Sequence, residues 1–230
     1  MDREISTIIV AGGMGKRLGA DVPKAFVRLG GRYLFHYPLD TFLRHDAVAE
    51  IILVVPDAAV EKTEEIVNTF APEKPVVIVN GGKERWQSVR NGVLTAEETS
   101  DWVLVHDAAR PFMSAEIIDS LLEKRDRFKC VFTATPVEDT VRRYENDTCI
   151  ETLDRRSLLR VGTPQLFHRE SLIEAFSHAE PMSPPPTDEA VLMEKNGIPI
   201  GFVWGDPKNF KITTPHDLIL AEALVSFQKA

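Results

Sequence analysis

The chain has 230 residues, which is long enough for one sizeable α/β domain. Its net charge of −8 argues against a nucleic-acid-binding protein, and its two cysteines are too few for a disulfide framework or a Cys-based zinc site. No run approaches the ~20 apolar residues of a membrane helix, and the N-terminus has no apolar signal core, so we expect a cytoplasmic protein without a membrane partner.

Strands and helices are predicted to alternate over the first 130 residues. Apolar runs rich in β-branched residues predict buried strands at 8–10, 51–55, 76–79 and 102–105. The intervening segments predict helices at 33–45, 57–70, 84–97 and from 114 onward. This alternation predicts an α/β fold with a mostly parallel sheet, flanked by helices and built with right-handed crossovers.

The alternation ends after a predicted strand at 130–135. The polar segments 140–144 and 148–152 flank a turn and predict a β-hairpin. An isolated two-stranded arm is marginally stable, so we expect it to protrude and pack against a second subunit. A helix from 187, a strand at 198–203 and a helix at 215–227 follow. We expect a single domain over 1–230, with the arm at about 137–155 as its dimerisation element.

The most informative stretch is the loop after the first strand. Its glycines let the backbone turn with positive φ and direct N–H groups at an anion, and Arg17 and Lys24 add two cations. Lys24 follows Pro23, which fixes the corner from which the lysine extends. Open α/β sheets bind ligands at the carboxyl ends of their strands. We interpret the loop as a nucleotide triphosphate cradle.

Two known phosphate-binding motifs nearly match this loop and fail. A P-loop needs Ser or Thr after Gly15-Lys16, where this chain has Arg17. The dinucleotide fingerprint needs a third glycine where Leu18 stands, which disfavours a hydride-transferring oxidoreductase although Asp57 ends the second strand. A plain βα turn and a non-catalytic nucleotide-binding module remain alternatives.

Four further clusters follow predicted strands. In 81–88, glycines and Ser88 are suited to recognise the edge of a base, although a simple turn and helix start is the preferred explanation of this cluster taken alone. In 106–111, the carboxylate of Asp107 suits Mg²⁺, and Arg110 suits bidentate phosphate binding. We interpret His106 as structural, because the other histidines form no ligand-spaced set for a metal phosphohydrolase.

The last two clusters lie later in the chain. One combines Thr140, Asp154 and Arg155 on the arm with residues 163–165 on its return. The other combines 187–190 with 209–213. Thr187 also fits a helix cap. Lys211 lies between apolar neighbours in a predicted short strand, and alternation would direct it away from them, toward the site.

Together and in this order, the motifs resemble the 2-C-methyl-D-erythritol 4-phosphate cytidylyltransferase family over nearly the whole chain. They comprise residues 11–17 with 23–24, 81–82 with 84–85 and 88–89, 105–111, 163–165, and 187–190. The resemblance implies a Rossmann-like nucleotidyltransferase fold with a protruding, dimerising β-arm. It also implies transfer of a cytidylyl group from CTP to methylerythritol phosphate, with release of pyrophosphate, in non-mevalonate isoprenoid synthesis.

The nearest alternative is the sister enzyme that uses ribitol 5-phosphate. That enzyme usually has valine at the position of Ala109 and lacks the glutamate found here at Glu189. Both positions therefore favour methylerythritol phosphate as the acceptor.

The resemblance also implies roles for individual residues. Arg17 and Lys24 would be catalytic, stabilising the α-phosphate of CTP, with Lys16 assisting at the triphosphate. Nucleotide binding is implied for Ala11, Gly12, Gly13, Gly81, Gly82, Ser88 and, together with Mg²⁺, Asp107. Acceptor binding is implied for Asp107, Arg110, Thr163, Thr187 and Lys211, and for Thr140 and Arg155 from the partner subunit of a homodimer.

Overall fold

A computed structural model describes residues 5–13, 15, 18, 23–179 and 183–228. The larger strands are β1 (Ile5–Val10), β4 (Val48–Val55), β5 (Val76–Asn80), β6 (Trp102–Asp107), β7 (Cys130–Pro136), β10 (Leu159–His168) and β11 (Ile200–Trp204). The α-helices are α1 (His36–Arg44), α2 (Val60–Asn68), α3 (Arg85–Thr95), α4 (Glu116–Leu122), α5 (Arg169–Ala175), α6 (Ala190–Lys195) and α7 (Pro215–Gln228). None of these described helices is long and apolar enough to cross a membrane.

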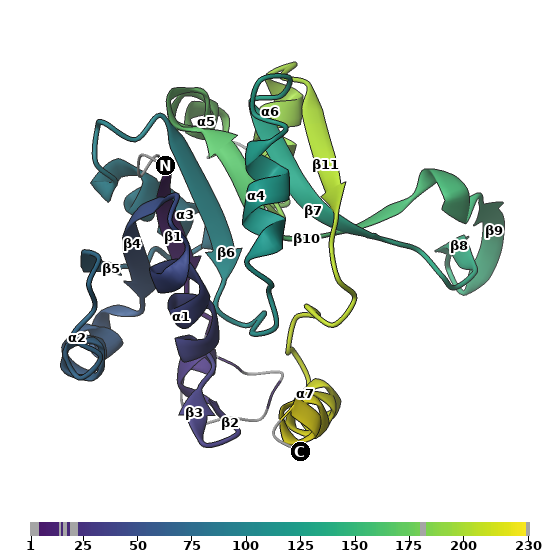
Figure 1. The fold of residues 1–230 in the computed structure, drawn as a ribbon. Coiled ribbons are helices and arrows are strands. Elements are labelled where there is room, and N and C mark those ends of the chain that lie inside the picture. The colour runs from purple at the N-terminus through teal and green to yellow at the C-terminus, as the bar shows by residue number, and fades with distance from the viewer. Residues whose placement is uncertain (1–4, 14, 16–17, 19–22, 180–182, 229–230) are drawn as a thin grey trace.

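The strands form one central sheet, which within the described residues has seven strands in the order β11-β7-β10-β6-β1-β4-β5. β10 runs antiparallel to both of its neighbours, and every other pair in the sheet is parallel. The prediction of a mostly parallel α/β sheet flanked by helices is confirmed (Figure 1).

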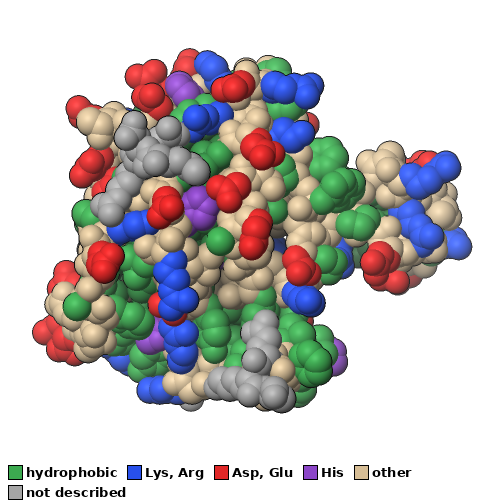
Figure 2. Space-filling model, in the orientation of Figure 1, with side chains coloured by type: hydrophobic (Ala, Val, Ile, Leu, Met, Phe, Trp, Pro, Cys, Tyr) green, Lys and Arg blue, Asp and Glu red, His purple; other side chains and the backbone are tan. Residues whose placement is uncertain are grey.

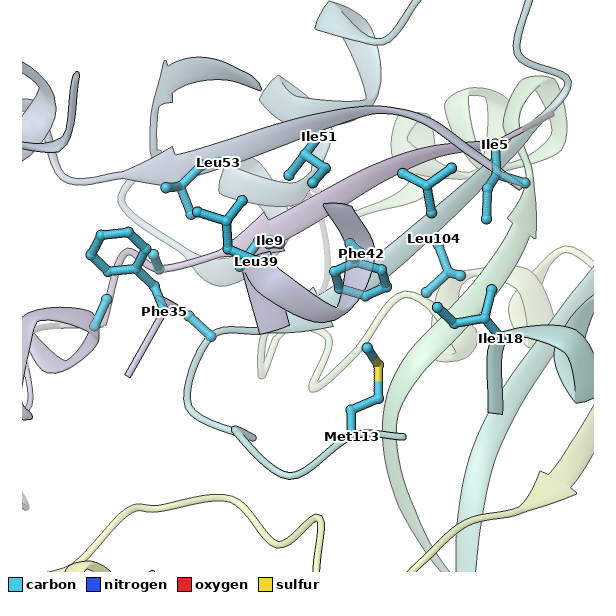
Figure 3. Close-up of a cluster of buried hydrophobic side chains, with 14 of the residues drawn as sticks. Ile5, Ile9, Phe35, Leu39, Phe42, Ile51, Leu53, Leu104, Met113 and Ile118 are labelled. Carbon is cyan, nitrogen blue, oxygen red and sulfur yellow. The ribbon is translucent and has the colours of Figure 1, made fainter. Parts of the chain in front are cut away.

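Alternate side chains of each strand enter cores on opposite faces of the sheet. Ile5 and Ile9 of β1 pack with α1, α2 and α4 on one face (Figure 3), while Ile8 packs with α3, α5 and α6 on the other. α3 approaches the sheet closely because residue 92 is glycine: a Cβ there would lie 2.6 Å from Ile8 Cγ2. This close packing holds the start of α3 beside the carboxyl ends of β1 and β4.

The predicted hairpin arm is confirmed. β8 (Val141–Glu145) pairs antiparallel with β9 (Thr148–Leu153), and the pair projects from the end of the β7–β10 ladder (Figure 1). Asn146 and Asp147 both have positive φ, as a two-residue type I′ turn requires. Most arm side chains are exposed, and its surface carries Arg, Asp and Glu side chains (Figure 2).

A smaller hairpin lies beside the loop that follows β1. β2 (Arg28–Leu29) pairs with β3 (Arg32–Tyr33), and α7 packs against it through Ala221 and Val225 in a separate small core. The C-terminal helix therefore covers this region rather than the sheet (Figure 1).

His36 makes stability depend on pH. The ring packs edge-on against Phe35 and Phe70, and its Nε2 has no hydrogen-bond partner among the described residues. Burial, and then Arg32, lower the pKa of His36 from 6.5 to about 4. Below pH 6.5 the unfolded chain therefore binds a proton that the folded chain does not, so the free energy of unfolding falls as pH drops from 6.5 toward 4.

We expect His36 to lower the free energy of unfolding by about 1 kcal/mol between pH 7 and pH 5. This value is smaller than the full pKa shift would give, because the ring is only half-buried. Urea unfolding at both pH values measures the loss, and His36→Phe, which cannot titrate, should lose less stability than the wild type. An equal loss in the two proteins would contradict the assignment.

Candidate functional site

A cavity of about 430 Å³ opens at the carboxyl ends of β1 and β6. Its lining comprises Val10, Ala11, Gly12, Gly13, Gly15, Lys24, Ala25, Gly82, Lys83, Glu84, Arg85, Ser88, Asp107, Ala108, Ala109, Lys211 and Thr213. The loop after β1, the start of α3 and the end of β6 thus meet at one place, as expected for polar residues that follow neighbouring strands of a parallel sheet.

The loop after β1 is fixed at both ends. The backbone N–H of Ala11 donates to Val54 O at 2.8 Å, and that of Lys24 donates to Gly13 O at 2.8 Å. Gly15 has φ 67°, which glycine adopts readily. Lys24 follows Pro23 and opens a short 3-10 turn, Lys24–Phe26. The backbone of Lys24 is therefore tied to the glycine loop. Lys16 and Arg17 lie outside the described residues.

Ser88 closes the second glycine turn. Its hydroxyl accepts from Gly82 N at 3.0 Å and donates to Glu84 O at 3.3 Å. Residue 82 must be glycine here, because a Cβ would lie 2.3 Å from Gln87 Cβ. Both hydrogen bonds of Ser88 stay within the turn. A direct contact between Ser88 and a base remains a prediction.

Asp107 lies at the centre of the site, almost fully buried. Its Oδ1 is 3.1 Å from Arg85 Nε, its Oδ2 is 2.8 Å from Lys211 Nζ, and Arg110 Nε is 3.8 Å away. Burial alone would raise the pKa of Asp107, but Arg85 and then Lys211 hold it well below its usual range. Asp107 is therefore an ionised carboxylate among three cations.

Lys211 does not lie in a strand, so the prediction of a short strand at this position was wrong. The segment is irregular, and it is anchored by the Ile212 backbone N–H, which donates to Ala109 O at 2.9 Å, and by the buried Ile212 side chain. Lys211 nevertheless reaches the site through its ion pair with Asp107.

Arg85 and Glu189 form a second buried contact. Both residues belong to the sequence motifs, but the sequence analysis did not predict that they contact each other in the site. Arg85 Nη1 lies 2.9 Å from Oε1 and 2.7 Å from Oε2 of Glu189, whose side chain is fully buried. Burial raises the pKa of Glu189, and the Arg85 guanidinium opposes that shift. The sequence feature that could have indicated a site role for Arg85 is its position in the first turn of a helix that follows a glycine turn.

Thr163 and His106 fix the backbone at Asp107. His106 Nε2 is 3.0 Å from Arg110 O, and because a carbonyl only accepts, Nε2 carries the hydrogen. His106 Nδ1 then accepts from the Thr163 hydroxyl, which itself accepts from Asp107 N at 3.0 Å. Burial lowers the pKa of His106 to about 4, so the ring is neutral near pH 7. These contacts agree with a structural role for His106.

Two further cavities adjoin the first. One of about 190 Å³ is lined by Arg85, Asp107, Arg110, Val161, Gly162, Thr163, Gln165, Thr187, Asp188 and Lys211. The other, of about 290 Å³, also has Arg110 in its lining and includes Thr133, Thr135 and Arg160. Arg110, Thr163, Thr187 and Lys211 are thus brought together, and Asp107 lies between this group and the 430 Å³ cavity.

Thr140 and Arg155 are not part of this group. Both are exposed on the arm, neither lines the cavities around Asp107 and Arg110, and Arg155 Nη1 donates to Glu138 O. Within one described chain, the arm therefore adds no side chain to the site.

The donor set at Asp107 fits a magnesium ion that arrives with phosphates. Among the described residues, no three His, Cys, Asp or Glu side chains gather as a metal site. Mg²⁺ is usually held by one or two carboxylates together with waters and substrate phosphates, and Asp107 offers one ionised carboxylate where two cavities meet.

The mostly parallel sheet, with a glycine loop, a lysine and a buried carboxylate at its carboxyl edge, defines an α/β nucleotidyltransferase. A sequence model of the 2-C-methyl-D-erythritol 4-phosphate cytidylyltransferase family matches residues 5–226. The chain belongs to this family.

Relatives and solved structures agree with this membership. The 2-C-methyl-D-erythritol 4-phosphate cytidylyltransferase of Alkaliphilus metalliredigens is 37% identical to this chain, and the match covers 98% of this chain and 95% of the relative. The enzyme of the same name from Bacillus licheniformis is 38% identical, and the match covers 96% of each chain. The crystal structure of 4-diphosphocytidyl-2C-methyl-D-erythritol synthase from Anaerococcus prevotii has a TM-score of 0.86 at 29% identity and covers 97% of this chain and 96% of its own. The crystal structure of the cytidylyltransferase from Thermus thermophilus has a TM-score of 0.78 at 33% identity, and the match covers 97% of this chain and 99% of that one.

Proposed function

We propose that the cavities around Asp107 are the active site at which this enzyme transfers a cytidylyl group from CTP to 2-C-methyl-D-erythritol 4-phosphate and releases pyrophosphate. The observation that carries the proposal is the position of Asp107. Its buried, ionised carboxylate borders both the 430 Å³ cavity with the glycine loop and the 190 Å³ cavity with Arg110. A nucleotide and an acceptor bound in the two cavities would meet at this residue.

The proposed chemistry needs no side-chain base. A phosphate monoester has a second pKa of about 6, so the acceptor is largely dianionic near pH 7 and can attack the α-phosphorus of CTP directly. Catalysis then consists of alignment and charge stabilisation. Lys24, whose backbone is tied to Gly13, would stabilise the α-phosphate, together with Arg17 and with Lys16 at the triphosphate.

The 430 Å³ cavity is assigned to CTP. Backbone groups of the two glycine turns would recognise cytosine and the phosphates, from Ala11, Gly12, Gly13, Gly81, Gly82 and Ser88. Asp107 would hold the Mg²⁺ that accompanies the triphosphate, and the ion supplies neutralisation of phosphate charge when bound. The same carboxylate would also face the acceptor's hydroxyls.

The 190 Å³ cavity is assigned to the acceptor, which Arg110, Thr163, Thr187 and Lys211 would surround. The hydroxyl hydrogen of Thr163 is directed to His106, so Thr163 would accept a hydrogen bond from an acceptor hydroxyl rather than donate one. The arm would mediate a homodimer, in which Thr140 and Arg155 come from the partner subunit.

We expect methylerythritol phosphate to be a better acceptor than ribitol 5-phosphate by about tenfold or more in kcat/KM. Both acceptors have five carbons, but they differ in branching and in one hydroxyl, and small differences of this kind commonly give about 10–200-fold discrimination. Ala109, which lines the nucleotide cavity, and Glu189 follow the methylerythritol pattern.

Pyrophosphate release with CTP and each acceptor measures this preference, and a reaction without acceptor gives the background. Equal kcat/KM values for the two acceptors would contradict the assigned specificity. Binding of CTP without pyrophosphate release would instead indicate a non-catalytic nucleotide-binding module.

A further inference from the structure

We propose that Glu189 is a positioning residue that acts through Arg85 to hold the Asp107 carboxylate in its working orientation. This inference rests on the proposed role of Asp107 between nucleotide and acceptor. Glu189 itself is fully buried and lines neither cavity that Asp107 borders, so it does not contact a substrate bound there.

Arg85 bridges Asp107 and Glu189. Its Nε contacts Asp107 Oδ1 at 3.1 Å, and its Nη1 contacts both oxygens of Glu189. A guanidinium is a planar group with donors in a fixed arrangement, so binding Glu189 at one end sets the direction in which Nε points at the other. The guanidinium plane is therefore set by a residue 104 positions away in the sequence.

Asp107 also forms a close ion pair with Lys211. Lys211 holds Oδ2 at 2.8 Å, but its side chain is 38% exposed and it lies on an irregular segment, whereas the Arg85 side chain is 23% exposed and begins helix α3. Lys211 is a flexible point charge, and Arg85 is a rigid fork. The orientation of Asp107 therefore depends mainly on Arg85.

Glu189 adds a second negative charge beside the cations around Asp107. Among the described residues, Arg85, Arg110 and Lys211 are the cations paired with Asp107, and Glu189 is a second carboxylate, in contact with Arg85. Asp188 is nearby, but its carboxylate accepts from Gln165 Nε2 and Val191 N and belongs to a separate contact. Without the charge of Glu189, three cations would compete for the single carboxylate of Asp107.

The test uses Glu189→Gln, which keeps the size of the side chain and removes its charge. We expect kcat/KM for the acceptor to fall by about 10–100-fold, the usual effect of removing a partner that orients a functional group. Glu194→Gln removes a charge from an exposed position of the same helix, α6, and should behave like the wild type.

A double-mutant cycle separates positioning from a general loss of structure. If Glu189 acts through Asp107, then adding Glu189→Gln to Asp107→Asn lowers the rate little further. Multiplicative effects on the rate would overturn the proposal. Where Glu189→Gln fails to fold, Arg85→Lys replaces it in the cycle, because it keeps the charge and removes the fork.

Crystal structures provide a readout that does not depend on turnover. We expect the Arg85 Nε–Asp107 Oδ1 contact to be present in the wild type and in Glu194→Gln, and to be lost in Glu189→Gln. An unchanged contact in Glu189→Gln would overturn the positioning role. Absence of pyrophosphate release by the wild type would instead overturn the proposed function, so the two failures are distinguishable.

Discussion

Lys24→Ala is expected to lower kcat by about 10²–10³-fold while changing the KM for CTP much less. Lys24 lines the 430 Å³ cavity, and its backbone is held by Pro23 on one side and by the hydrogen bond to Gly13 O on the other. Negative charge at the α-phosphate accumulates mainly in the transition state, so a fixed cation there contributes more to kcat than to binding.

Steady-state pyrophosphate release at varied CTP separates the two effects. Lys62→Ala is a matched control: Lys62 Nζ lies 5.2 Å from the centre of the Phe26 ring, in the same turn as Lys24, but does not line the cavity. Arg17→Ala is expected to resemble Lys24→Ala. A nearly normal kcat in Lys24→Ala would contradict its catalytic assignment.

The second large effect is a gain of activity when two inactive proteins are mixed. Arg155 is exposed on the projecting arm and lines none of the cavities around Asp107, so in a shared site it would serve the opposite subunit. Arg155→Ala should weaken acceptor binding and leave CTP binding nearly intact. A dimer of one Arg155→Ala chain and one Lys24→Ala chain contains one site with both residues intact.

Random exchange makes half of the dimers mixed, so we expect about a quarter of wild-type activity. Mixing Lys24→Ala with Asp107→Asn is the negative control, because both residues line the same cavity of one chain. Each site of that mixed dimer lacks one of the two residues, so we expect no recovery of activity. No recovery from the Arg155→Ala mixture, despite proven subunit exchange, would assign Arg155 to its own subunit.

Local sequence pattern was sufficient for most of the sheet but not for β10. Strands β1, β4 and β6 are mostly apolar runs, and their residues are buried on both faces, as the pattern indicates. β5 is equally apolar but lies at the edge of the sheet, where Val77 is exposed. β10 contains Gly162 and Pro164, residues that count against a central strand. The structure accommodates them at a register shift between Gly162 and Gln165. That irregularity depends on the neighbouring strand β7, and no local pattern encodes it.

The site was predictable where polar residues follow a strand, and less so where contacts join distant segments. The glycine turns and Asp107 meet because parallel strands end at one edge of the sheet. The contact between Arg85 and Glu189 joins the first residue of α3 to the residue that precedes α6, and its geometry depends on how the two helices pack on the same face. Lys211 was predicted to reach the site, although the short strand assumed for it does not exist.

The position of β7 in the sheet has a consequence for synthesis on the ribosome. Both neighbours of β7, β10 and β11, come later in the chain, whereas β1, β4, β5 and β6 are adjacent in the sheet and complete by residue 107. The half that carries the glycine loop can therefore assemble while the rest is still being translated. At a translation rate of about 5–20 residues per second, several seconds pass between the synthesis of β7 and that of its partner strands. During this time both edges of β7 are unpaired and can pair with the wrong strand.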